Sequence, residues 1–188
     1  MRRMAILFDY FAADSDEHAA TAIDRIGGPA SDRLTTSEPT ASPQRRRGLF
    51  RRTPEPAVAP APEASSEPLE LFDTVSGVVD PVVQMGTFEE LLTGRPYDDI
   101  VDDPRAGYVV ADRDGGERLV LALSDTLAAA LAAASDERLA EVAAPWVETE
   151  EFWGDGDPEL AGEFLRDLAA LARRAQTGGR HLYCWVCV

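Results

Sequence analysis

Lysine and asparagine are absent from this chain of 188 residues, and cysteine and histidine occur only twice each. All strongly basic side chains are therefore arginines. A structural zinc site usually takes four cysteine or histidine ligands, and only His18 and His181 could complete one begun by the two cysteines. A Ser-His-Asp site would also depend on one of these histidines. We expect no metal, no cofactor and no catalytic residue.

Motifs of the common nucleotide-binding and hydrolytic sites are missing too. The chain has no Walker loop, no G-x-G-x-x-G and no G-x-S-x-G. Its apolar runs are short, since Asp9 interrupts the first one before it reaches the roughly 7–15 apolar residues of a signal peptide. No stretch approaches the ~18 apolar residues of a membrane-spanning helix. These absences predict a cytoplasmic protein.

Negative charge dominates the chain, which has 34 acidic residues against 18 basic ones and a formal charge of −16 at pH 7. Such a charge repels nucleic acids and anionic membranes and attracts basic partners or cations. We therefore expect a basic protein as partner, and no nucleic acid or membrane bound by the folded part. The alternative is an acidic surface that is merely solvated and needs no partner.

Residues 29–68 differ in composition from the rest, because proline, serine, threonine, alanine and glutamate dominate there. Few large apolar side chains are available to offset the entropy of ordering, so we predict a disordered insertion. Its run RRRGLFRR could dock on an acidic partner, a nucleic acid or lipid head groups. The alternative is a solvated charge cluster, either free in solvent or resting on the acidic body of the same protein. This candidate docking motif comprises Arg45, Arg46, Arg47, Phe50, Arg51 and Arg52.

The flanking regions predict one compact α+β domain, a mixed sheet with helices packed on it, interrupted by this Pro/Arg-rich insertion. Residues 1–28 supply a first strand that is apolar on both faces and a helix capped by Asp14. Residues 69–188 supply the main body of the same domain. We expect the first and last strands to pair in one sheet.

The main body shows clear boundaries of strands and helices. A strand is predicted near residues 70–79, followed by a helix capped by Thr87 and closed by Gly94. Alternating apolar residues on both sides of the turn DRDGG predict a hairpin. Three further helices are predicted. The first begins at Ser124, the second begins at Ser135 and ends at Pro145, and the third begins at Asp157 and ends at Gly178.

The last eight residues, HLYCWVCV, hold both cysteines in a C-x-x-C spacing that could indicate a redox or metal site. In an extended strand, however, Cys184 and Cys187 point to opposite faces with Cα atoms about 10 Å apart. A disulfide needs Cα atoms within about 7 Å. We predict that both thiols fill space in a buried strand. Tyr183 and Trp185 should share one face of it, against the last helix or an opposite sheet layer.

The stretch APWVETEEFWGDGDPE is distinctive because two tryptophans stand among many carboxylates. Tryptophan is enriched at the centres of protein interfaces, and acidic neighbours would attract a basic partner. This stretch is our candidate partner-binding site; the alternative is that both indoles fill the core while the acids cover the loop. The candidate contact residues are Trp146, Glu148, Glu150, Glu151, Phe152 and Trp153.

A second acidic stretch, YDDIVDDP, carries four aspartates. Helical spacing would place Asp98 with Asp102 on one face and Asp99 with Asp103 on another. Such pairs could hold a divalent cation or perform acid/base chemistry, so a metal-dependent hydrolase is the alternative function. The simpler interpretation is a solvated face, because like charges at this spacing cost only a few tenths of a kcal/mol.

Several segments recur in the order found in a known family: MAILFDYFAADSDEHAATAI, DPVVQMGTFEELLTG, LSDTLAAALAAASDERLAE, FLRDLAALARRA and the last strand. In this order the chain resembles the YfbM-like family of bacterial proteins of unknown function. The resemblance implies a compact α+β domain and brings no catalytic residue. The chain departs from the family in its insertion at 29–68 and in the run VVQMGTFEE, which lacks the family's usual tryptophan.

The charge, the loop aromatics and the missing motifs together favour a non-enzymatic protein that binds a basic partner. An immunity protein against a basic toxin would be one example. A third hypothesis is recruitment through the arginine-rich insertion, with the folded domain as passenger.

Overall fold

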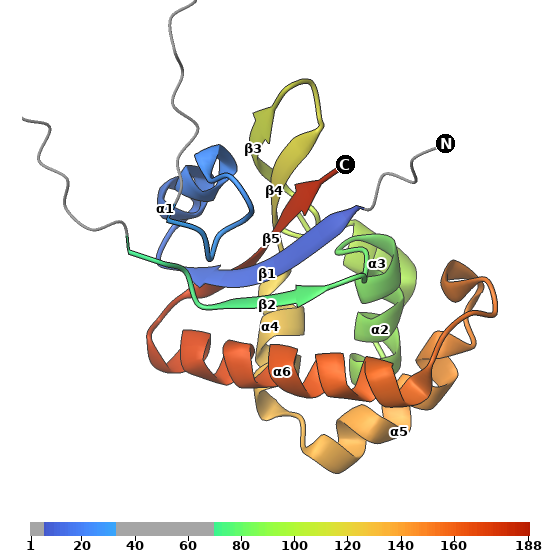
Figure 1. Cartoon of the computed structure of the whole chain (residues 1–188). Coiled ribbons are helices and arrows are strands. Elements are labelled where there is room, and N and C mark those ends of the chain that lie inside the picture. Colours follow the sequence, from blue (N-terminus) through green and yellow to red (C-terminus); the bar gives the residue numbers. More distant parts are fainter. Residues whose placement is uncertain (1–5, 33–69) are drawn as a thin grey trace, which may run out of the picture.

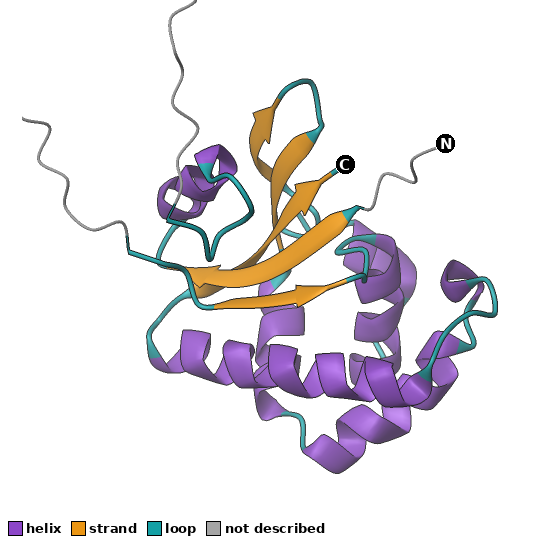
Figure 2. Cartoon of the chain, in the orientation of Figure 1, coloured by secondary structure: helices purple, strands orange, loops and turns teal. Residues whose placement is uncertain are grey.

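A computed structural model describes residues 6–32 and 70–188, which form a single α+β domain (Figure 1, Figure 2). Within these residues no helix is long and apolar enough to cross a membrane. The strands are β1 (Leu7–Ala13), β2 (Thr74–Gly77), β3 (Val109–Arg113), β4 (Arg118–Ala122) and β5 (His181–Cys187). The helices are α1 (Asp16–Ala20), α2 (Val83–Thr93), α3 (Tyr97–Val101), α4 (Asp125–Ala133), α5 (Asp136–Val147) and α6 (Pro158–Thr177), with short 3₁₀ segments η1 (Thr21–Asp24) and η2 (Glu150–Phe152).

The strands form one sheet in the order β2-β1-β5-β4-β3. The predicted pairing of the first and last strands is confirmed, with Tyr10 opposite Cys184, and β3 and β4 form the predicted hairpin. Every strand pair in the described chain is antiparallel, so the expectation of a mixed sheet is wrong.

The two faces of the sheet carry unequal layers of helices (Figure 1). Helices α2, α4, α5 and α6 lie on one face, and α1 with η1 lies on the other. Side chains alternate along β1, so Tyr10 and Ala12 enter the larger core while Phe11 and Ala13 enter the smaller one. This arrangement explains why the first strand is apolar on both faces.

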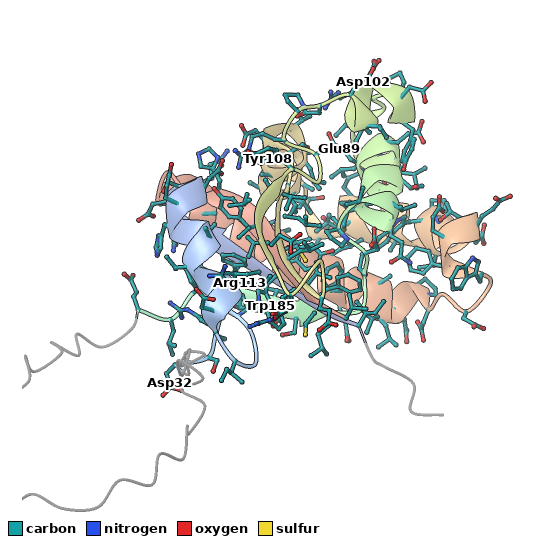
Figure 3. All side chains as sticks on the ribbon, turned by 90° about the horizontal axis from the view of Figure 1, so that it is seen from above. Asp32, Glu89, Asp102, Tyr108, Arg113 and Trp185 are labelled. Carbon is teal, nitrogen blue, oxygen red and sulfur yellow. The ribbon has the colours of Figure 1, made fainter. Side chains whose placement is uncertain are left out.

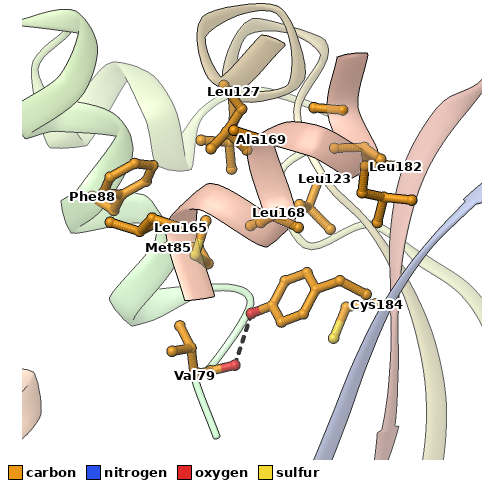
Figure 4. Close-up of a cluster of buried hydrophobic side chains, with 14 of the residues drawn as sticks. Val79, Met85, Phe88, Leu123, Leu127, Leu165, Leu168, Ala169, Leu182 and Cys184 are labelled. Carbon is orange, nitrogen blue, oxygen red and sulfur yellow. Dashed lines mark hydrogen bonds between the residues drawn. The ribbon is translucent and has the colours of Figure 1, made fainter. Parts of the chain in front are cut away.

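The larger core is built around α6, whose Leu165 and Leu168 are fully buried. Figure 4 shows them beside Met85 of α2 and close to β5. At the edge of this core the Tyr10 hydroxyl donates a hydrogen bond to the Val79 carbonyl at 2.7 Å. The segment leading into α2 is thereby tied to β1.

Short-range hydrogen bonds start three helices where the sequence predicted them. The Ser124 hydroxyl accepts from the Leu127 N–H at 3.0 Å, and Ser135 caps α5 in the same way. The Asp157 carboxylate accepts from the Glu159 N–H at 2.9 Å. These caps satisfy backbone donors that the first turn of a helix leaves free.

Three other predicted helix boundaries are wrong. Ser15, rather than Asp14, caps α1. Helix α2 starts at Val83, where the Asp80 carboxylate accepts the amide, so Thr87 lies inside the helix. Helix α5 runs past Pro145 to Val147. Pro145 has no N–H to donate to the Glu141 carbonyl, so it costs α5 one helical hydrogen bond. The two residues that follow it are nevertheless buried.

The last strand confirms that the two cysteines do not form a disulfide. Both thiols are free; Cys184 lies in the larger core, and Cys187 borders the smaller one on the opposite face. Burial raises the pKa of the Cys184 thiol, which keeps it protonated and unreactive. Tyr183 and Trp185 do share a face, but they pack in the smaller core beside α1 rather than against the last helix.

The chain leaves the described domain at residue 32 and returns at residue 70, and one buried side chain holds both ends. The Arg25 guanidinium donates to the carbonyls of Pro29 at 2.9 Å, Ser31 at 3.3 Å and Glu70 at 2.7 Å. It also lies 4.4 Å from the ring centroid of Phe72. The ordered domain therefore extends past the predicted boundary at residue 29; the disorder predicted up to residue 68 concerns residues that are not described.

Candidate functional site

The two tryptophans of the acidic stretch have opposite environments. Trp146 on α5 is fully buried, its indole N–H donates to the Gln84 carbonyl at 2.8 Å, and its ring packs between Phe88 and Phe152. A fully buried indole cannot touch a partner, so Trp146 is excluded as a contact. Phe152 is partly buried against it, and both rings support the loop from beneath.

Trp153 is the most exposed large aromatic residue of the described chain, with 90% of its surface accessible. It ends η2, where its N–H donates to the Glu150 carbonyl at 3.0 Å. Its backbone has a φ of 49°, in the left-handed region, which costs a bulky residue about 1 kcal/mol or more. Neither the exposure nor the backbone conformation stabilises the fold, so a role outside folding is the better explanation.

Carboxylates surround Trp153 without compensating cations. Between Arg138 and Arg166 the sequence has eight acidic residues and no basic one. Within the residues that the structure describes, none of the ion pairs involves an acid of residues 148–157. We call residues 148–157 the Trp153 loop. Its exposed carboxylates create a local negative potential that would attract a basic partner.

An open groove of about 360 Å³ adjoins the Trp153 loop, between α2, α3 and η2. Glu90 shapes one wall, because its carboxylate accepts the N–H of Tyr97 at 3.1 Å and so fixes the start of α3 against α2. We call this hollow the glutamate groove. Its lining residues are Thr87, Glu90, Tyr97, Thr149, Glu150 and Glu151.

Glu151 connects the groove to the loop. Its Oε1 accepts from the Thr87 hydroxyl at 3.2 Å, and its carbonyl accepts from the Gln84 amide at 3.2 Å. Its Oε2 is shielded from solvent and has no hydrogen-bond partner in the described part of the chain. The nearby polar groups, Thr149 first, lower the pKa of Glu151, so its carboxylate is charged at neutral pH.

The pKa of the Tyr97 phenol is raised by burial and by the negative charges that surround the groove. Burial raises the pKa of its phenol, and the carboxylates of Glu151, Asp80 and Glu90 raise it further, because each opposes the formation of another negative charge. The groove therefore combines an aromatic ring with a negative potential, a combination that suits a cationic group.

The aspartates of YDDIVDDP do not converge on a common point. Asp98, Asp99 and Asp102 are exposed, and Figure 3 shows Asp102 at the periphery of the molecule. Asp103 instead pairs with Arg95 at 3.5 Å. Across residues 6–32 and 70–188 no three histidine, cysteine, aspartate or glutamate side chains are placed to hold a metal ion. A metal-dependent hydrolase at this cluster has no structural support.

A buried carboxylate that the sequence analysis missed lies on α2. Glu89 is almost fully buried, accepts hydrogen bonds from Ser124 at 2.8 Å and Arg95 at 3.1 Å, and has its pKa raised by burial (Figure 3). It borders a cleft of about 50 Å³, enough for a few water molecules at most. Both carboxylate oxygens have partners, so this network ties helices together and leaves no room for a substrate.

A second polar cluster lies where α1 meets β5. The Tyr183 hydroxyl donates to Asp16 at 2.8 Å, Arg105 contacts the same carboxylate at 3.2 Å, and His181 lies 3.1 Å from Asp125. Burial, followed by the hydrogen bond to Asp16, raises the pKa of Tyr183 to about 12. These contacts tie α1 to β5, although the Arg105 Nε–H is buried and has no hydrogen-bond partner in the described chain.

Sequence reasoning found the acids of the Trp153 loop and missed the opposite wall of the groove. Thr87 was predicted as the cap at the start of a helix, and Glu90 follows it by three residues. The same spacing places both residues on one face of the longer helix α2. This spacing was the feature of the sequence that could have predicted that the two residues share a wall. No pattern in the sequence predicted that Tyr97 lines the groove.

No protein-family model, curated protein or solved structure matches the chain. The resemblance to the YfbM-like family therefore stays a prediction. The candidate docking motif lies outside the described residues: Arg45, Arg46, Arg47, Phe50, Arg51 and Arg52.

Proposed function

We propose that this protein is a non-enzymatic binding module that engages a basic protein through the Trp153 loop. The observation that carries the proposal is a 90% exposed indole, held on a left-handed backbone among carboxylates that have no ionic partner in the described chain. A large rigid aromatic side chain is a typical anchor of an interface. Surrounding carboxylates would speed association with a basic surface and exclude acidic ones.

The exposure of the side chains supports a smaller set of contact residues, with different roles for exposed and buried ones. Glu148, Glu150 and Trp153 are exposed and form the contact surface. Trp146 and Phe152 form a T-shaped pair with ring centroids 5.0 Å apart directly under the loop. The buried pair thus acts as a rigid support, which limits the entropy lost when a partner binds. An immunity protein against a basic toxin would be one form of such a module.

Site-specific photo-crosslinking tests the proposal. A photoreactive residue at position 155, two residues after Trp153, should crosslink to the partner in cells. The purified partner should then bind the full chain in calorimetry. We expect Trp153→Ala to weaken binding at least about tenfold. Glu150→Arg should also weaken binding of the partner, and the loss should be larger at low salt than at high salt.

Glu17→Arg is the matched control, because it makes the same charge change on α1, which lies on the opposite face of the sheet. This variant should bind the purified partner nearly as well as the unmodified chain. An acidic partner, or equal binding by the Trp153→Ala and unmodified chains, would refute the proposed function.

A further inference from the structure

We infer that the candidate docking motif of this chain, residues 45–52, binds the chain's own domain at the cleft beside Glu89. The motif, RRRGLFRR, lies outside the described residues and carries five arginines and no acid. The cleft lies between α2, α3 and the start of α4, and we call it the α2–α3 cleft. The inference goes beyond the proposed function, which concerns the Trp153 loop.

The α2–α3 cleft has apolar walls, and its polar groups are already satisfied. Its volume of about 50 Å³ is roughly that of a few water molecules or of the branched end of one leucine. Glu89 and Ser124 are its polar lining residues, and the other lining residues are aliphatic, methionine or glycine. The Glu89 carboxylate accepts from Ser124 at 2.8 Å and from Arg95 at 3.1 Å. An occupant therefore needs to supply an apolar group and no hydrogen bond.

Two valines at the α2–α3 cleft remain in contact with solvent. Val82 and Val101 line the cleft and have 43% and 58% of their surface accessible. Burial of apolar surface is the main favourable term in association, so two adjacent apolar side chains suit this surface. Leu49 and Phe50 are such a pair. The leucine is the one that fits the cleft by size, while the phenylalanine covers the valines.

Helix α3 places unpaired carboxylates beside the same cleft. Asp98, Asp99 and Asp102 are exposed, and none of them belongs to an ion pair of the described chain. They flank Ile100 and Val101, which line the cleft. In the candidate docking motif, arginines likewise stand on both sides of the apolar pair. An apolar centre flanked by negative charge thus meets an apolar centre flanked by positive charge, which is electrostatic complementarity.

The covalent connection favours this occupant over a separate molecule. Leu49 follows residue 32, where the described chain breaks off, by 17 positions. Seventeen residues reach up to about 60 Å, whereas a domain of this size has a radius of gyration of about 15 Å. A tether that spans its site gives an effective concentration in the millimolar range. A cleft that binds the free segment with a Kd of about 1 mM is then about half occupied in the intact chain.

A capped synthetic peptide of residues 43–54 tests the inference. Its receptor is the full chain with the five arginines of the motif changed to glutamine and with Leu49→Ser, so that its own segment cannot compete. In NMR titrations of this ¹⁵N-labelled chain at low salt, the peptide should shift the amides of Val82, Val101 and Gly107 saturably. The same peptide with Leu49→Ser should bind several-fold less tightly, because it lacks the apolar group that enters the cleft.

The charge of α3 is tested by changing its three exposed aspartates to asparagine in the receptor chain. This variant should weaken the peptide about tenfold at low salt, the sum of three exposed ion pairs, and less at high salt. The matched control removes three carboxylates from the Trp153 loop instead, through Glu148→Gln, Glu150→Gln and Asp155→Asn. It should leave the affinity for the peptide nearly unchanged. Thermal unfolding must first show that each variant is folded.

Four results would overturn the inference. The first three are equal weakening by the two triple variants, amide shifts centred on the Trp153 loop, and unchanged affinity of the Leu49→Ser peptide. The fourth is an identical position of the Val82, Val101 and Gly107 amides in the unmodified and the receptor chain, since the segment would then not occupy the cleft in its own chain. Trp153→Ala should not affect the peptide, so failure of this inference and failure of the proposed function give different results.

Discussion

At the scale of single residues, two tryptophans seven positions apart have separate roles. Trp146 fills the core and donates a hydrogen bond, while Trp153 is exposed. We expect Trp146→Ala to lower the free energy of unfolding by about 3–5 kcal/mol, because it leaves a cavity. Trp153→Ala should change it by no more than about 0.5 kcal/mol. Urea unfolding measures both, and a comparable loss in the two variants would contradict the assignment.

Tyr183 gives a residue-scale prediction for alkaline pH. Its folded pKa of about 12 exceeds the unfolded value of about 10, so its protonated form is favoured by folding. This contribution is fully present below pH 10 and is lost as the pH rises through about 12. Tyr183→Phe lacks the titrating group, so the stability advantage of the unmodified chain should shrink across that window. A constant difference in urea midpoints from pH 9 to pH 12 would be inconsistent with this.

At the scale of elements, Arg25 closes the base of the insertion through three carbonyl acceptors and one ring contact. Arg25→Met keeps the length of the side chain and removes every donor, leaving carbonyl groups without partners. We expect a loss of about 2–4 kcal/mol in the free energy of unfolding, and faster amide exchange at residues 30–32 and 70–72. The exposed Arg166 provides the control, since Arg166→Met should leave both measurements nearly unchanged.

The same closure predicts that the domain folds without the insertion. Replacing residues 34–68 with four glycine and serine residues shortens the connection from 37 residues to six. Loop-closure entropy then favours the shortened chain by up to about 1.5 kcal/mol. Thermal unfolding should remain cooperative with an equal or higher midpoint. Loss of cooperativity would show instead that the replaced residues contribute to the core.

The separation along the chain between interacting residues explains which elements could be predicted from the sequence. Ser124 and Asp157 cap helices through bonds to residues two or three positions away, so local pattern was sufficient. That α2 begins at Val83, with its amide bonded to Asp80, rather than at Thr87 depends on how the helix packs, which the local pattern does not contain. The glutamate groove joins Glu90, Tyr97 and Glu151 from three segments, and only the folded chain brings them together.

At the scale of the whole molecule, some surface carboxylates are paired with arginines and others are not. Several surface carboxylates face an arginine: Asp24 lies 3.0 Å from Arg113, and Asp73 pairs with Arg174. The arginine hydrogen bonds lower the pKa of both aspartates. The Trp153 loop has no such pairs in the described domain. A surface that gives up stability for binding has this pattern.

The uneven distribution predicts opposite effects of neutralising the two sets of carboxylates. Replacing Glu148, Glu150 and Asp155 by their amides should raise the free energy of unfolding by about 0.5–1 kcal/mol, since like charges a few residues apart repel by a few tenths each. The gain should shrink as salt screens the repulsion, while affinity for the basic partner falls. Asp24→Asn with Asp73→Asn should lower stability, because each removes an ion pair. If the loop variant is instead destabilised at low salt, the loop carboxylates support the fold and are not held for a partner.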